Sequence, residues 1–177
     1  MLTISQLVAF PIFDGIPRDI MDRIGQAAQA LDYEANAVIF REGQEASHLY
    51  GVMKGEVELS ILFRDRVMRA DVQYEDYVRK HVEIIEKEIV IEDLGPGEVF
   101  SWSALSAPHR LTSTATCCRP TRVFALEASR LKAVLAQAPA VGYLFMQRVS
   151  EIIARRLRNR TDKLLESWYE AFEVENV

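Results

Sequence analysis

Short apolar runs separated by turn residues fill the middle of the chain, and they constrain its fold more than any other feature. Between residues 31 and 126 apolar positions alternate over a few residues at a time, as at Val57, Leu59 and Ile61. The chain is predicted to reverse direction at Gly43 and at Lys54-Gly55. Further strands are predicted at 88–94, 112–118 and 121–126. Because no helical pattern alternates with these strands, they predict a sandwich or barrel rather than a parallel sheet.

Helical patterns flank this region on both sides. Residues 4–29 predict short helices broken by two prolines and a glycine, and residues 128–136 predict another short helix. A much longer helix is predicted from about 141 to 172. We therefore expect a mainly β fold with flanking helices (α+β), a jelly-roll or double-stranded β-helix barrel. Its predicted parts are N-terminal helices at 1–30, a β-roll at 31–126 and C-terminal helices at 127–177.

The long helix carries two apolar faces. Phe145, Val149 and Ile152 are predicted to pack on the barrel. A second face alternates steps of four and three, as in a coiled-coil seam, at Met146, Ser150, Ile153, Leu157, Arg160, Leu164, Ser167 and Ala171. The alternative is one broad core-facing stripe. We favour a homodimer through this helix, because one small barrel offers little surface to its distal half.

Residues 64–85 fit the barrel pattern least well. The segment is rich in charge, and its apolar and aromatic residues share one helical face. Those residues are Tyr74, Tyr77, Val78, His81, Val82 and Ile85. We expect a helical insertion between two strands that decorates the surface rather than docking a partner.

Composition narrows the function classes. Twenty-six acidic against 21 basic residues give a net charge of −5, so the chain lacks a basic footprint for nucleic acid, and no direct DNA binding is expected. The end at Val177 leaves no room for a DNA-binding domain after the long helix, so a partner protein would have to read DNA. Two adjacent cysteines, Cys117 and Cys118, exclude a disulfide scaffold and favour a cytoplasmic location. No membrane segment or signal peptide is predicted.

Catalytic and metal chemistry find no support in the residue spacing. The three histidines, His48, His81 and His109, are far apart, whereas a metal enzyme of this architecture needs closely spaced histidines and a carboxylate. No nucleophile elbow, Walker loop or zincin helix occurs. We expect no enzyme activity, no metal and no cofactor.

The ordered set of elements, together with scattered short motifs, resembles the cyclic-nucleotide-binding domain, the sensor half of catabolite activator proteins. The matching motifs are Glu42-Gly43-Gln44, Leu49-Tyr50, Val52, Gly55-Glu56-Val57, the run from Leu94 to Phe100, and Ala154-Arg155-Arg156-Leu157. The resemblance covers roughly residues 10–165 apart from 64–85.

The resemblance implies a ligand cassette at 101–105 followed by 108–112. In this family a short helix donates backbone N–H groups to the ligand phosphate, an arginine pairs with the phosphate, and a glutamate accepts from the ribose hydroxyl. Arg110 takes the arginine's place, Thr112 lies near the small hydroxyl position, and Ser101 replaces the usual glycine. The cassette residues predicted to bind ligand are Ser101, Trp102, Ser103, Ala104, Arg110, Leu111 and Thr112.

Trp102 falls where the ribose-binding glutamate belongs. An indole has only an N–H donor, so it cannot accept the ribose hydroxyl's proton, and its bulk fills the ribose volume. Losing one hydrogen bond to a charged acceptor costs about 1.5–3 kcal/mol before any clash. Three interpretations remain. In the first, another small anionic or aromatic molecule binds and stacks on Trp102. In the second, Trp102 fills a pocket that binds no ligand, and the chain is a structural dimer module; in the third, cyclic nucleotide binds weakly in a shifted pose. We favour the first.

In this family the long helix also contacts the nucleobase of the ligand, and the resemblance places these contacts at Arg160 and Thr161. Arg160 lies in the proposed seam, where a buried guanidinium needs an anionic ligand or an acidic partner. The alternative is that Arg160 extends to solvent. The sequence thus predicts a non-catalytic, dimeric ligand-sensing module for a small anionic or nucleotide-like effector other than ordinary cyclic AMP or GMP. The alternative is a ligand-free dimerisation or scaffold module.

Overall fold

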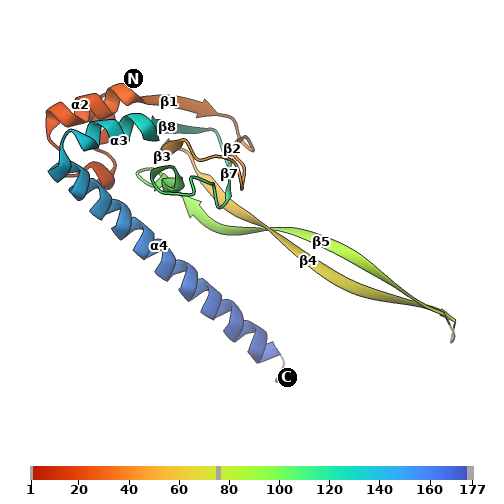
Figure 1. Ribbon diagram of the computed structural model, residues 1–177. Coiled ribbons are helices and arrows are strands. Elements are labelled where there is room, and N and C mark those ends of the chain that lie inside the picture. The colour runs from red at the N-terminus through yellow and green to blue at the C-terminus, as the bar shows by residue number, and fades with distance from the viewer. Residues whose placement is uncertain (1, 75–76, 175–177) are drawn as a thin grey trace.

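The computed structural model describes residues 2–74 and 77–174. Helices begin and end the chain, and strands lie between them (Figure 1). The helices are α1 (Ile4–Leu7), η1 (Pro11–Phe13), α2 (Arg18–Ala27), η2 (Trp102–Leu105), α3 (Ala128–Ala136) and α4 (Pro139–Val174), of which η1 and η2 are short 3-10 helices. The predicted helices at 128–136 and 141–172 are therefore confirmed, and those at 4–29 are confirmed up to Ala27, after which Ala28 and Gln29 begin a strand.

The strands form two antiparallel four-stranded sheets, one ordered β1-β8-β3-β6 and the other β2-β7-β4-β5. Their bounds are β1 (Ala28–Tyr33), β2 (Val38–Phe40), β3 (His48–Lys54), β4 (Val57–Tyr74), β5 (Tyr77–Leu94), β6 (Val99–Phe100), β7 (Thr114–Cys117) and β8 (Thr121–Glu127). The mainly β jelly roll is confirmed, but the two sheets do not close into the expected barrel. Strand structure begins at Ala28, inside the predicted N-terminal helical part.

Strand β8 is buried on both faces, which places it at the centre of the fold. Phe124 and Leu126 point into one apolar cluster, shared with the helices, and Val123 points into a second cluster between the two sheets. This alternation follows from the two-residue period of a strand. On the helical side, Phe10 packs edge-to-face on Phe124 with ring centroids 4.7 Å apart.

The apolar contacts of helix α4 with the roll lie in its first half. Phe145 and Val149 are buried and Ile152 is half-buried against the same cluster as Phe124, which confirms the predicted docking face. Beyond it the helix leaves the roll, and its seam residues Leu157 and Leu164 are 64% and 51% exposed. The side chain of Ala171, the last predicted seam position, lies outside the described part.

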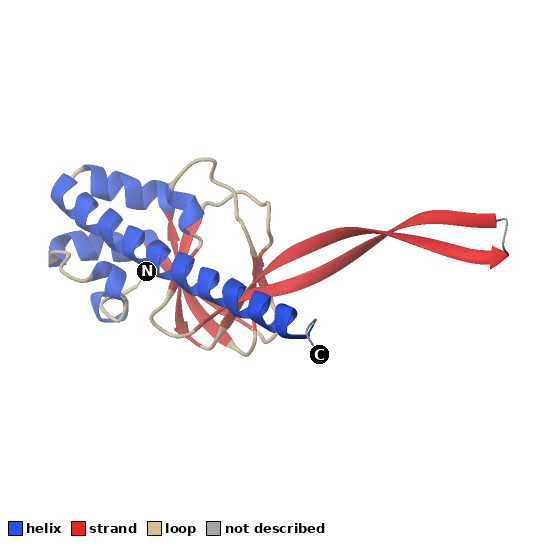
Figure 2. Ribbon diagram, turned by 90° about the horizontal axis from the view of Figure 1, so that it is seen from below, coloured by secondary structure: helices blue, strands red, loops and turns tan. Residues whose placement is uncertain are grey.

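Residues 64–74 and 77–85 form paired strands, and the predicted helical insertion is wrong. β4 and β5 pair antiparallel from Val57 opposite Leu94 to Tyr74 opposite Tyr77, with register shifts at Leu59/Ser60 and Val72/Tyr74. They project from the roll as a long twisted arm (Figures 1 and 2). Among the described residues of β4, Val57 to Ser60 at the base of the arm also pair with β7.

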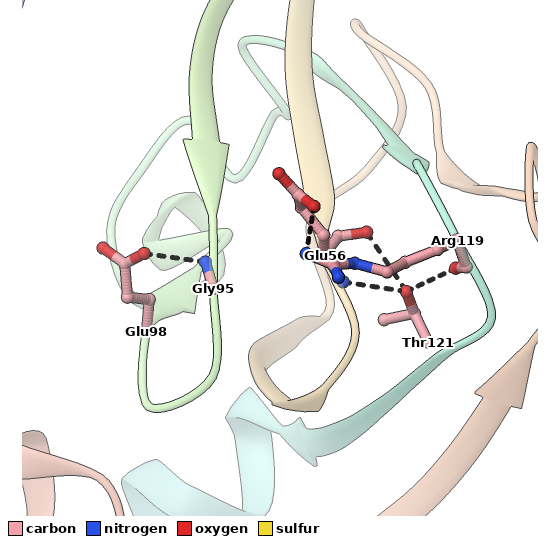
Figure 3. Close-up of polar contacts among 5 residues, drawn as sticks. All are labelled: Glu56, Gly95, Glu98, Arg119 and Thr121. Carbon is pink, nitrogen blue, oxygen red and sulfur yellow. Dashed lines mark hydrogen bonds and ion pairs between the residues drawn. The ribbon is translucent and has the colours of Figure 1, made fainter.

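The predicted reversal at Gly55 is confirmed by its backbone and its surroundings. Its φ of +98° is a left-handed conformation, and a Cβ there would lie 2.4 Å from Thr121 Oγ1. Thr121 Oγ1 accepts from the Glu56 N–H at 3.1 Å and donates to the Arg119 carbonyl at 2.7 Å, and Arg119 pairs with the Glu56 carboxylate (Figure 3). Glu56 and Thr121 therefore fix the β3–β4 turn against the start of β8.

No helix among residues 2–74 and 77–174 combines the length and apolarity that crossing a bilayer requires.

We predict that Gly51→Ala lowers the free energy of unfolding by about 1–3 kcal/mol, because added core volume forces neighbours to move. A Cβ at Gly51 would lie 2.2 Å from the Phe124 ring and 2.8 Å from the Phe10 ring. Gly95→Ala is the matched control, since the nearest atom to its Cβ is 4.0 Å away. Urea unfolding measures both variants, and equal stability of the two would refute this account of strand β3.

Candidate functional site

The cassette turn begins in a backbone conformation that suits glycine. Ser101, which precedes η2, has φ +66° and ψ +36°. A side chain in this left-handed region costs roughly 1 kcal/mol or more. Its hydroxyl oxygen is buried and has no hydrogen-bond partner among the described residues. The serine predicted to replace a glycine therefore has a backbone conformation that suits glycine, and it brings an unsatisfied polar group with it.

Trp102 lies beneath a buried arginine of α4. The Arg156 guanidinium carbon is 4.7 Å from the centre of the Trp102 ring, which is cation–π distance. The indole also packs against the apolar cluster that holds Phe124. The position predicted to hold a ribose-binding carboxylate thus holds an indole that stacks against one of the protein's own arginines.

Arg156 is the most buried charge of the site, with 4% of its side chain exposed. Its Nε pairs with Glu92 Oε1 at 2.8 Å, and its Nη2 donates to the Val99 carbonyl at 2.7 Å. Arg160, one helical turn later, reaches the other oxygen of Glu92 at 3.3 Å. Glu92 of β5 therefore joins two arginines of α4, and Arg156 tethers the helix to β5, β6 and the cassette.

Burial and charge act in opposite directions on Arg156. Burial lowers the pKa of its guanidinium, while Glu92 and Glu98 raise it. Arginine nevertheless stays protonated in proteins. A charge that cannot be given up must be paired, which makes Glu92 indispensable to this arrangement.

A small cavity of about 20 Å³ lies where the cassette turn meets α4. Its walls are Phe40, Leu59, Ser101, Trp102, Ser103, Leu111, Thr112, Ser113, Arg156 and Arg160. A cavity must exceed about 10–15 Å³ to hold one water molecule. A nucleotide would therefore enter only if Trp102 or α4 moved.

Six of the nine predicted ligand-binding residues meet at this cavity: Ser101, Trp102, Ser103, Leu111, Thr112 and Arg160. The other three lie elsewhere. Ala104 is buried in the cluster between the sheets, and the exposed Thr161 donates its hydroxyl hydrogen to the Leu157 carbonyl within α4.

Arg110 is exposed, and it lines none of the cassette cavity's wall. Its Nη1 donates to the Gly43 carbonyl at 2.9 Å. The loop that carries it is held by backbone pairing, with the Leu111 N–H on the Gln44 carbonyl at 2.9 Å. Arg110, expected to line the ligand site, therefore lies on the surface beside Gly43. Arg156 is the buried arginine of the site.

Sequence reasoning missed two residues, Arg156 and Glu92. Arg156 falls at the end of the stripe Phe145, Val149, Ile152, where a charge on an apolar face signals a buried partner. Glu92 carries no comparable signal, because its partner lies 64 residues away on another element.

We predict that Glu92→Gln lowers the free energy of unfolding by about 3 kcal/mol or more, because it leaves the buried Arg156 without a counter-charge. Glu86→Gln is the matched control, since Glu86 pairs with Arg64 at 2.7 Å with half or more of each side chain exposed. Such a surface pair is worth at most about 1 kcal/mol. Chemical unfolding of both variants decides the matter, and a similar loss in each would show that Arg156 does not depend on Glu92.

Comparison with known proteins agrees with the geometry. A model of the family described as "Cyclic nucleotide-binding domain" matches residues 30–138. A CRP-like cAMP-activated global transcriptional regulator of Mycobacterium tuberculosis is 21% identical over 153 residues, which cover 86% of this chain and 58% of that protein. The chain therefore spans less than two thirds of this relative's length.

Solved structures show the same fold. A putative cyclic nucleotide-binding protein from Geobacter metallireducens superposes with a TM-score of 0.67 at 22% identity and covers 89% of this chain and 99% of its own. The catabolite activator protein of Thermus thermophilus gives a TM-score of 0.61 at 24% identity, over 87% of this chain and 61% of its own. With the family match spanning more than half of its residues, this chain belongs to the cyclic nucleotide-binding domain family.

Proposed function

We propose that this chain is a non-catalytic regulatory module that senses a small anionic or nucleotide-like effector other than ordinary cyclic AMP or GMP. One observation carries the proposal: Ser101 Oγ, Arg156 Nη1 and Arg160 Nε are all buried, belong to residues lining one cavity, and have no partner in the described chain. Unsatisfied buried donors cost about 1–3 kcal/mol each, more when charged. An anionic effector would satisfy the two guanidinium donors.

Trp102 argues against the ordinary cyclic nucleotides. Its indole stands at the family's ribose position, and it offers no acceptor for a hydroxyl group. The indole face is covered by Arg156 at 4.7 Å, so an effector that displaced this arginine would gain an aromatic wall for stacking.

Helix α4 is the element that would change position when an effector binds. Arg156 and Arg160 belong to α4, and both contact Glu92 of β5. An anion that competes with Glu92 for these guanidinium groups would shift α4 relative to the roll. Such a shift requires the effector to prefer one state by a few kcal/mol.

We further propose that the chain forms a homodimer through α4 and that a partner protein recognises the position of this helix. The seam residues Met146, Ile153, Leu157 and Leu164 are 38–64% exposed, although they repeat at coiled-coil spacing. The relative in Mycobacterium tuberculosis is a transcriptional regulator, but α4 alternates basic and acidic blocks, which suits paired surface charges better than DNA. Two free, adjacent cysteines favour the cytoplasm as the compartment.

We predict that a thermal-shift screen of nucleotides, cyclic dinucleotides and small aromatic acids yields a stabilising anion, while cyclic AMP and GMP do not stabilise at micromolar concentration. Arg160→Gln should weaken the effector about tenfold or more, because a charge-assisted hydrogen bond is lost. Arg158→Gln is the control, since Arg158 is exposed on the same helix and lines none of the cassette cavity. Robust stabilisation by cyclic AMP would overturn our interpretation of Trp102.

A ligand-free dimerisation or scaffold module is the second candidate. The cavity of about 20 Å³ and the Trp102–Arg156 stack favour it, since the protein's own side chains fill the family site. Under this hypothesis no compound in the screen stabilises the protein.

We predict that Leu164→Glu shifts the dimer towards monomer and raises its dissociation constant about 100-fold or more, because an unpaired charge is costly in an apolar seam. Gln147→Glu places the same charge on an exposed position outside the seam and should leave the assembly unchanged. Sedimentation equilibrium measures both variants. A monomeric wild-type protein, or equal assembly of the two variants, would exclude the helix as the dimer interface.

A further inference from the structure

A second cavity, of about 160 Å³, lies between η1, the turn before β6 and the first half of α4. Its apolar wall is built from Pro11, Ile12, Val99 and Ile152. Among the residues that the structure describes, it shares only Arg156 with the cassette cavity. It is therefore a separate site on the other side of that arginine.

One face of α4 brings two guanidinium groups to this cavity. Arg148, Ile152 and Arg156 follow one another at intervals of four residues, so they lie along one side of the helix. Arg148 Nε and Arg156 Nη1 are both buried, and neither finds an acceptor within the described chain. Two arginines that line the cavity thus each keep one unsatisfied donor.

The acidic residues around the cavity offset part of this charge. Glu98 acts electrostatically on Arg156, although its Oε2 also accepts from the Gly95 N–H at 2.8 Å (Figure 3). Glu151 meets Arg148 Nη1 at 3.5 Å, and Glu92, outside the cavity wall, pairs with Arg156. Arg155 adds a third, exposed guanidinium. The case for an anion therefore rests on the unsatisfied donors of Arg148 and Arg156 rather than on a net charge.

We propose that this cavity binds a small organic carboxylate with a compact apolar body about the size of a benzene ring. A cavity of about 150 Å³ lined by apolar side chains is known to hold benzene, so the volume fits. The carboxylate pairs with Arg148 and Arg156, and the body packs on Pro11 and Ile152. The site needs none of the cassette residues 101–112, but it shares Arg156 with the proposed effector site.

Benzoate is the probe, tested on the full chain with Trp168→Phe as background so that Trp102 alone reports by fluorescence. We expect saturable binding that changes Trp102 emission, because Arg156 touches both the new site and the indole. Acetate lacks the apolar body and benzyl alcohol lacks the charge, so each should bind at least about tenfold more weakly.

Arg148→Gln should weaken benzoate about tenfold or more, Arg148→Lys should weaken it less, and the exposed Arg158→Gln should leave it unchanged. Calorimetry confirms each dissociation constant, and thermal melting of the free variants confirms that they fold. No binding of benzoate, or equal binding by Arg148→Gln and wild type, would overturn the proposal. If Arg160→Gln weakens benzoate and Arg148→Gln does not, the acid occupies the cassette cavity. This site is then refuted, while the proposed function stands.

Discussion

The buried guanidinium of Arg156 is the interaction on which the rest of this structure depends. It ties α4 to β5 through Glu92, to β6 through the Val99 carbonyl and to the cassette through the face of Trp102. An arginine that is 96% buried can be neither neutralised nor released to water cheaply, so the protein must keep it paired. Helix α4 therefore does not rest on the roll only through apolar contacts such as Phe145 and Val149. Its docking also depends on the ion pair of Arg156 with Glu92.

The fold was largely predictable because most of its elements bury one face and leave a period in the sequence. Phe145, Val149 and Ile152 recur at helical spacing and face the core, as predicted. Val57 and Leu59 are buried as their alternation predicts, but the register shift after Leu59 buries Ser60 and leaves Ile61 half-buried. The β4–β5 arm escaped prediction for the opposite reason. Beyond Ser60, the described part of β4 pairs with β5 and not with β7, and pairing between two strands imposes no hydrophobic alternation of its own. Residues such as Tyr77, Val78 and His81 then fit a helical face by chance. Local patterns report burial, so an unburied element is poorly specified by them.

The candidate site was predictable in its local parts and unpredictable in its long-range ones. The motif order placed Trp102 and Ser101 in the cassette turn, where the structure has them. The orientation of Arg110 depends on backbone pairing between residues 109–111 and 43–46, which no local pattern encodes. The pairing of Arg156 with Glu92 links β5 to α4 across 64 residues, so only the folded chain reveals it. The sequence therefore predicted residues that line one cavity, but it placed Arg110 there, where the structure has Arg156.

The indole at position 102 changes what an anion would have to do at this site. Where the resemblance predicts a carboxylate, Trp102 stacks against Arg156, and Arg156 takes its counter-charge from Glu92. Under the proposed function, an arriving anion would therefore compete with Glu92 for this guanidinium. The second proposed site uses the same guanidinium, so two anions bound at once would share one cation and each would weaken the other. Linkage requires that the factor is the same in both directions. The two proposals taken together thus predict that Arg156 couples both sites to the position of α4.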